Sequence, residues 1–157
     1  RGGEGPRALE LCLKAIELLR REPRTRFWRP AEDATIAQAE AALGTTIPPS
    51  LRHFLRHVGR CEANGHEVLG LSGDGFDTNM GSNIVGATLK ARPYGLPDSC
   101  IVVETEANGV EVVVDTADVT SCVRRWFKGP GWVEEETHAS FGEYLLDVAH
   151  DGDKDEP

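Results

Sequence analysis

Residues 36–58, IAQAEAALGTTIPPSLRHFLRHV, decide the fold because they encode two amphipathic helices and the turn between them. In the first helix, expected over 33–43, apolar residues recur at helical spacing: Ile36, Ala39, Ala42 and Leu43. Gly44 follows directly, and glycine readily takes the left-handed conformation that ends a helix. The sequence therefore predicts that the first helix stops at Gly44.

A proline pair separates the two helices. Pro48 and Pro49 prevent the first helix from continuing, and Pro49 suits the first turn of a new helix, where a backbone N–H is not needed. The second helix is expected over 50–58, with apolar residues at positions i, i+3, i+4 and i+7: Leu51, Phe54, Leu55 and Val58. Both apolar stripes need a surface to cover, and the strand-rich second half of the chain is the candidate.

Two segments rich in β-branched residues, 100–106 and 110–115, are predicted strands. Asn108 and Gly109 lie between them and both tolerate a positive φ angle, which predicts a tight hairpin turn. A further strand is expected over 121–127. These strands form the second half of the predicted core.

Helices are expected on both sides of the strands. Pro6 suits the start of an N-terminal helix, and Ser140 with Glu143 three residues later forms a capping box at the start of the last helix. Helices before and after a run of strands indicate an α+β fold.

Length and composition are those of an ordinary globular protein, with 157 residues, 39% hydrophobic and 27% charged. We assign 6–150 to a single domain and expect 1–5 and 151–157 to be disordered termini. No apolar run approaches the roughly 20 residues that a membrane helix needs, so we expect no membrane contact.

The net charge of −9 is unevenly distributed along the chain. Residues 1–60 carry 11 Lys+Arg and 7 Asp+Glu, a net of +4, whereas 61–157 carry 6 and 19, a net of −13. An acidic body repels nucleic acid and attracts a basic partner over a long range. Solubility alone would also account for an acidic surface.

A cluster of arginines surrounds Phe27 and Trp28: Arg20, Arg21, Arg24, Arg26 and Arg29. Arginine beside an aromatic ring can bind a phosphate and stack on a base. Five arginines are few beside a second half with a net charge of −13, so we expect no nucleic-acid binding. We interpret Phe27 and Trp28 as core anchors and the arginines as partners of acidic neighbours.

No catalytic or metal-binding motif is present in the sequence. His53 and His57 have the four-residue spacing of metal ligands, but no glutamate follows His53 as H-E-x-x-H requires. The four cysteines, Cys12, Cys61, Cys100 and Cys122, are widely spaced and indicate reduced thiols in a cytoplasmic protein, although one disulfide is compatible with them. We expect no enzymatic activity, no cofactor and no structural metal.

Residues 72–82, SGDGFDTNMGS, are predicted to form a long loop that contacts a partner. Asp74 and Asp77 could offer oxygen ligands to calcium, but the glycine and the bidentate glutamate of a calcium loop are missing. Phe76 supplies a large apolar group between these acids. An apolar centre within a polar rim is typical of protein–protein interfaces.

The order of these features resembles the SUKH superfamily, which contains Smi/Knr-type cell-wall regulators and bacterial toxin-immunity proteins. The matching features are Trp28, Pro30, Ile36, Glu40, Leu43-Gly44, Ile47-Pro48, Phe54-Leu55, Leu96-Pro97, the predicted strand Ile101–Glu104, Asn108-Gly109, Ser140-Phe141 and Tyr144-Leu145. The sequence departs from the usual pattern at the Pro48-Pro49 pair and at Leu51, where an aromatic residue is frequent. The resemblance runs from about residue 28 to 148 and implies a mixed, twisted β-sheet flanked by helices.

For function, the resemblance implies an immunity protein that occludes the active site of a cognate toxin domain, for example a basic nuclease. Acidic residues on exposed hairpins and in the 72–82 loop are the expected contacts: Asp74, Phe76, Asp77, Glu104, Glu106, Glu111, Glu134, Glu135 and Glu136. The alternative is a regulatory scaffold of the Smi/Knr type with several partners and no toxin.

Overall fold

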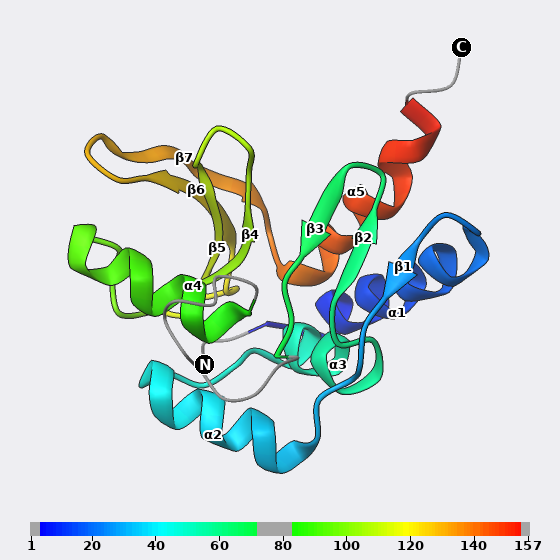
Figure 1. Cartoon of the computed structure of the whole chain (residues 1–157), viewed down its shortest axis with the longest axis horizontal. Coiled ribbons are helices and arrows are strands. Elements are labelled where there is room, and N and C mark those ends of the chain that lie inside the picture. The colour runs from blue at the N-terminus through cyan, green and yellow to red at the C-terminus, as the bar shows by residue number, and fades with distance from the viewer. Residues whose placement is uncertain (1–3, 72–82, 155–157) are drawn as a thin grey trace.

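Helices surround two antiparallel sheets in the computed structural model of the chain, which describes residues 4–71 and 83–154 (Figure 1). The helices are α1 Pro6–Arg21, α2 Asp33–Leu43, α3 Pro49–His57, α4 Ile84–Ala91 and α5 Phe141–Lys154, with a 3-10 turn, η1, at Arg92–Tyr94. The first sheet contains β1 Arg26–Phe27, β2 Cys61–Ala63 and β3 His66–Val68. The second contains β4 Cys100–Thr105, β5 Glu111–Asp115, β6 Val123–Phe127 and β7 Gly131–His138.

The α+β class is confirmed, and one detail of the expected sheet differs. The strand pairs within both sheets are antiparallel, and the strand order follows the chain, β1-β2-β3 and β4-β5-β6-β7. Short turns join β2 to β3 and the consecutive strands from β4 to β7, whereas α2 and α3 lie between β1 and β2. Parallel strand pairs would need longer crossover connections. The single mixed sheet that we expected is therefore divided into two antiparallel sheets.

A bulge in β4 joins the two sheets. The register of β4 against β5 shifts between Val102 and Glu104, which leaves Val103 as an extra residue. The Val103 carbonyl accepts a hydrogen bond of 2.8 Å from the Leu69 N–H, just beyond the end of β3. This contact fixes β3 against β4 and so sets which side chains of the two strands face each other.

The two central helices form as predicted. Gly44 has a φ of 73°, and its N–H donates to the Glu40 carbonyl at 2.8 Å. Pro49 is the first residue of α3. The predicted stripe residues are fully or almost fully buried, with the exception of Ala42: Ile36, Ala39, Leu43, Leu51, Phe54, Leu55 and Val58. Ala42 is exposed because it lies at the edge of the stripe, where no other element covers it.

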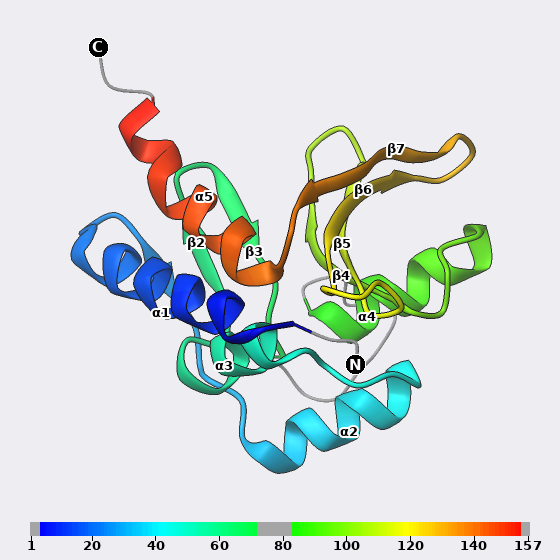
Figure 2. The same ribbon diagram turned by 180° about the vertical axis from the view of Figure 1, so that it is seen from behind.

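Helices α1 and α5 pack along each other, as Figure 2 shows. Their contact is close at Gly142, where a Cβ atom would lie 1.9 Å from the Ala8 carbonyl oxygen. Glycine is therefore required for this separation. Phe141, Tyr144 and Leu145 on α5 are buried, as predicted for the last helix.

The expected disorder of the termini is wrong for the residues that the structure describes. Both Glu4 carboxylate oxygens accept hydrogen bonds of 2.6 Å from Ser50, one from its N–H and one from its hydroxyl. At the other end, α5 continues to Lys154, and Asp151 contacts His66. Tertiary contacts that charge composition does not reveal order both segments.

The prediction for Phe27 and Trp28 is also wrong. Phe27 is 41% exposed, because β1 has two residues and lies at the edge of its sheet. Trp28 is half-buried, with the Arg60 guanidinium 4.1 Å from its ring centroid. Three of the five arginines pair with acidic neighbours, as in the Arg26–Glu62 ion pair of 3.5 Å, whereas Arg20 donates to the His57 carbonyl at 3.0 Å.

The β4–β5 turn is a hairpin of a different type from the predicted one. Gly109 has a φ of 89°, whereas Asn108 does not have a positive φ. The Gly109 N–H donates to the Glu106 carbonyl at 2.8 Å, and the Glu106 N–H donates to the Val110 carbonyl at 2.8 Å. This is the three-residue turn in which a left-handed glycine follows a β-turn.

Candidate partner-binding groove

A groove of about 390 Å³ lies between the four-stranded sheet and α5. Six carboxylates line it: Glu104, Glu106, Glu134, Glu136, Asp147 and Asp151. The other polar residues in its wall are Arg125, His66, His138, Thr137 and Tyr144. We call this feature the acidic groove.

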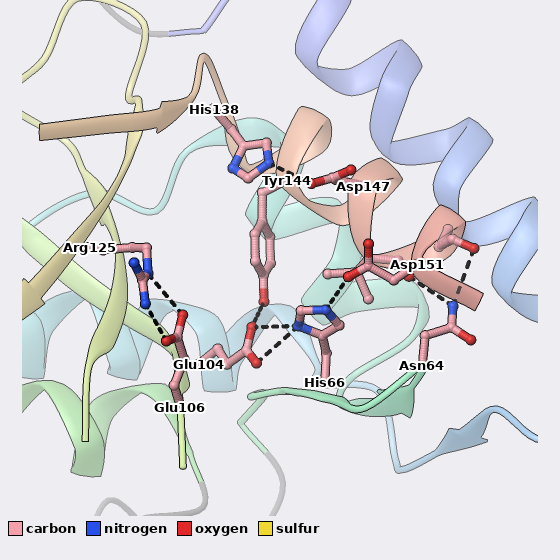
Figure 3. A network of polar contacts seen from close by, with 11 residues as sticks. Asn64, His66, Glu104, Glu106, Arg125, His138, Tyr144, Asp147 and Asp151 are labelled. Carbon is pink, nitrogen blue, oxygen red and sulfur yellow. Dashed lines mark hydrogen bonds and ion pairs between the residues drawn. The ribbon is translucent and has the colours of Figure 1, made fainter. Parts of the chain in front are cut away.

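The centre of the acidic groove is a hydrogen-bonded network around His66 (Figure 3). His66 Nδ1 lies 3.0 and 3.1 Å from the two carboxylate oxygens of Glu104, and Nε2 contacts Asp151 Oδ2. The Tyr144 hydroxyl donates to Glu104 Oε1 at 2.6 Å. The hydrogen bond with Glu104 raises the pKa of His66 to about 9 against the opposing effect of burial. His66 is therefore a cation at neutral pH, held between two carboxylates.

Asn64 fixes α5 against the turn between β2 and β3. Its side-chain amide donates to the carbonyls of Val148 at 2.8 Å and Ala149 at 3.3 Å. Asn64 has a φ of 52°, a left-handed conformation that asparagine tolerates better than most residues. The turn therefore holds the helix that carries Asp147 and Asp151.

Arg125 organises the other end of the network. Its guanidinium donates to both Glu106 oxygens, at 3.0 Å from Nε and 2.5 Å from Nη2, and to Glu134 Oε1 at 2.7 Å. The hydrogen bond to Glu106 is the largest cause that raises the Arg125 pKa above its usual value. Nearby, His138 Nε2 lies 3.1 Å from Asp147 Oδ2. These contacts between residues of the chain itself hold the side chains in place.

The acidic groove keeps an excess of negative charge. Six carboxylates face two cations, His66 and Arg125, so with His138 counted as neutral the difference is four charges. The excess carboxylates create a negative electrostatic potential, which the low dielectric constant of the groove walls strengthens. This potential attracts cationic groups. The arrangement is suited to binding a cationic surface.

The predicted contact residues divide into five groups. Asp74, Phe76 and Asp77 lie outside the described residues. Glu106, Glu134 and Glu136 come together in the acidic groove, whereas Glu135 is exposed and does not line it. Glu111 lines a separate pocket. Glu104 was predicted as an exposed contact, which is wrong, because it is 6% exposed and bonded to His66 and Tyr144.

Sequence reasoning did not identify His66, Arg125, Tyr144, Asp147 or Asp151 as members of the site. His66 lies 38 and 85 residues from its partners in the chain, so no local motif connects them. The sequence contains one weak indication of the network, because Tyr144 places a phenol hydroxyl on a predicted core face. A buried tyrosine hydroxyl usually has a hydrogen-bond partner.

The geometry offers no activated nucleophile beside His66. Both imidazole nitrogens already contact carboxylates. All four cysteines are free and buried, and burial raises the pKa of Cys61 to about 12. A thiol with that pKa is a poor nucleophile at neutral pH. Within residues 4–71 and 83–154, no cluster of three or more His, Cys, Asp or Glu side chains could hold a metal ion.

The family assignment agrees with this fold. The model of the family SUKH_5, described as SMI1-KNR4 cell-wall, matches residues 12–150. The chain belongs to this family. A search of curated proteins gave no match. In the described part of this SUKH_5 protein, no helix is long and apolar enough to cross a membrane.

Proposed function

We propose that this SUKH_5 protein is a non-enzymatic binding protein that neutralises a cognate toxin domain in the cytoplasm by covering its active site. The observation that carries the proposal is the acidic groove, with its excess of four negative charges and its prearranged ion pairs. A toxin that acts on nucleic acid has a basic substrate site, and an acidic surface complements that site in charge.

The division of the acidic groove into paired and unpaired carboxylates supports a docking role. Glu104 and Glu106 are neutralised by His66 and Arg125 and act as the support of the site. Glu136 is exposed at the rim and has no ion pair within the described ranges. An arginine or lysine of the partner would form an ion pair with Glu136. The surrounding side chains are already ordered by their own ion pairs, so less conformational entropy is lost on binding.

The contacts proposed outside the groove are those of the 72–82 loop, Asp74, Phe76 and Asp77. Phe76 would serve as an apolar anchor inside a polar rim.

The test begins with capture of the partner from the native cell and continues with surface kinetics on matched variants. Glu136→Lys and Glu135→Lys make the same charge change on one strand, but Glu136 alone of the two lines the groove. We expect Glu136→Lys to weaken binding about tenfold or more and Glu135→Lys to weaken it about threefold at most. Equal losses from both variants would place the interface elsewhere.

The regulatory scaffold of the Smi/Knr type is the second candidate, and the cell-wall description of the family favours it. Identification of the captured partner separates the two functions. A partner with toxic activity, relieved by this protein, supports immunity. Several partners without toxic activity support the scaffold.

A further inference from the structure

A second pocket of about 340 Å³ lies on the other face of the four-stranded sheet and is lined by residues of α4, η1, β5 and β6. Its apolar wall includes Ala87, Ala91 and Trp126. Pockets for small molecules usually have at least this volume, a mostly apolar lining and a few convergent polar groups. We call it the lysine pocket, because two of the four lysines of the chain, Lys90 and Lys128, line it.

Glu111 is the hydrogen-bond acceptor of the lysine pocket. The Thr105 hydroxyl donates to Glu111 Oε1 at 2.6 Å, which orients the carboxylate. The other oxygen, Oε2, has no hydrogen bond within residues 4–71 and 83–154. Burial raises the pKa of Glu111, because the charged form is partly removed from water. A ligand that donates an N–H to this carboxylate would recover part of the lost solvation.

The mouth of the pocket combines an aromatic ring with positive charge. Tyr94 is 59% exposed, and Lys128 Nζ lies 4.7 Å from its ring centroid. Lys90 is exposed and lowers the pKa of Glu111 through its charge, opposite to the larger effect of burial. Together Lys90, Lys128 and Glu111 carry a net charge of +1 when all three are ionised. This local charge is opposite in sign to the −9 of the whole chain.

We propose that the lysine pocket binds a small planar aromatic ligand that carries an N–H donor and a carboxylate. The ring packs against the wall formed by Trp126 and the alanines, with Tyr94 at the mouth. The N–H donates to Glu111, and the carboxylate pairs with Lys128 and Lys90. This inference does not depend on the proposed function, because none of these residues lines the acidic groove.

Indole-3-acetate is the probe, because it has one ring system, one N–H and one carboxylate. Titration followed by backbone NMR shifts should perturb Gly109, Lys128 and other residues around the pocket. At ordinary ligand efficiency a molecule of this size binds with a Kd of about 1 mM. Two analogues separate the contacts: tryptamine reverses the charge, and 1-methylindole-3-acetate removes the N–H. Each should bind about tenfold or more weakly than indole-3-acetate.

Protein variants provide the complementary test. Lys90→Gln combined with Lys128→Gln should weaken indole-3-acetate binding about tenfold, and Glu111→Leu should remove the difference between indole-3-acetate and its N-methyl analogue. Lys14→Gln is the matched control, because Lys14 is exposed on α1 and lines neither the lysine pocket nor the acidic groove. Equal binding of tryptamine, or no shifts around the pocket at several times the expected Kd, would overturn the proposal. The analogue comparison uses the wild-type protein, so it holds even where a variant fails to fold.

Discussion

The two faces of the four-stranded sheet differ in chemistry although they share the same strands. In β4, Glu104 faces the acidic groove, and the next residue, Thr105, faces the lysine pocket. In β5 and β6, Glu111 and Trp126 line the pocket while their neighbours Val112 and Arg125 line the groove. Successive side chains of a strand point to opposite faces of the sheet, which explains why neighbouring residues line different cavities. The elements that pack on each face of the sheet then determine which partners the side chains of that face have.

These elements supply different partners on the two sides. Helix α5 and strand β3 bring Tyr144, Asp151 and His66 to the groove, so a glutamate there is buried and bonded. Helix α4 brings Ala87 and Ala91 to the pocket, so Glu111 is left with one hydroxyl donor and a lysine nearby. Glutamate is therefore part of the structural support on one face, whereas on the other face it accepts a single hydrogen bond from the described residues.

The largest expected effect separates adjacent residues of β4. Glu104→Ala should lower the free energy of unfolding by about 3 kcal/mol, because it leaves the half-buried His66 cation with one carboxylate fewer and the buried Tyr144 hydroxyl without an acceptor. Thr105→Ala, on the other face, should cost about 0.5 kcal/mol. Urea unfolding measures both. Similar losses would mean that the two faces do not differ in the way described.

The next effect is a pH dependence confined to the groove. The pKa of His66 is raised to about 9, so its stabilising contribution is present below the unfolded value of about 6.5 and is lost as pH rises through 9. After allowance for its partial exposure, the contribution should be on the order of 2 kcal/mol. The free energies of unfolding of the wild type and of His66→Gln, measured at pH 6 and at pH 10, isolate the contribution of His66. A constant difference between the two proteins would contradict the ion-pair network.

On the pocket side, Gly109→Val should cost about 1–2 kcal/mol, because a β-branched residue would have to adopt a positive φ. A Cβ at this position would also lie 3.1 Å from Phe127 Cε1. Ala107→Val is the control, since Ala107 is in the same turn without a positive φ. Thermal unfolding compares the two variants. A larger loss from Ala107→Val would show that the turn geometry is not the cause.

The smallest effect is expected far from the sheet. Arg21 and Glu17 form an ion pair on α1, with side chains that are 70% and 64% exposed. Such pairs are screened by water, so Arg21→Gln should change the free energy of unfolding by less than about 0.5 kcal/mol. A loss comparable to that of Glu104→Ala would remove the distinction between the buried network and surface pairs.

The helical core could be predicted from the sequence because its signals are local. Gly44 and Pro49 mark the helix ends, and the residues from Ile36 to Val58 repeat with helical spacing. The capping serine before α5 is equally local, with the Glu143 N–H donating to the Ser140 hydroxyl at 3.2 Å. Patterns within a few residues are sufficient for such elements.

The acidic groove could be predicted only in its charge. Glu106, Glu134 and Glu136 were expected to act together, and they line one groove. Burial of Glu104 could not be anticipated, because it depends on the bulge at Val103 and on His66, which is 38 residues away in the chain. Acidic side chains are rarely buried unless they are paired, and the pairing is visible only in three dimensions.

The close packing of α1 on α5 also has a consequence for the order of events during synthesis. The apolar face of α1 leaves the ribosome before the helix that covers it, because α5 follows both sheets in the chain. Contacts between segments so far apart in the chain form slowly. The same late helix carries Asp147 and Asp151, so one wall of the groove is missing from a partly made chain. The nascent protein therefore gains the α5 wall of the acidic groove and the cover of the apolar α1 face in the same step.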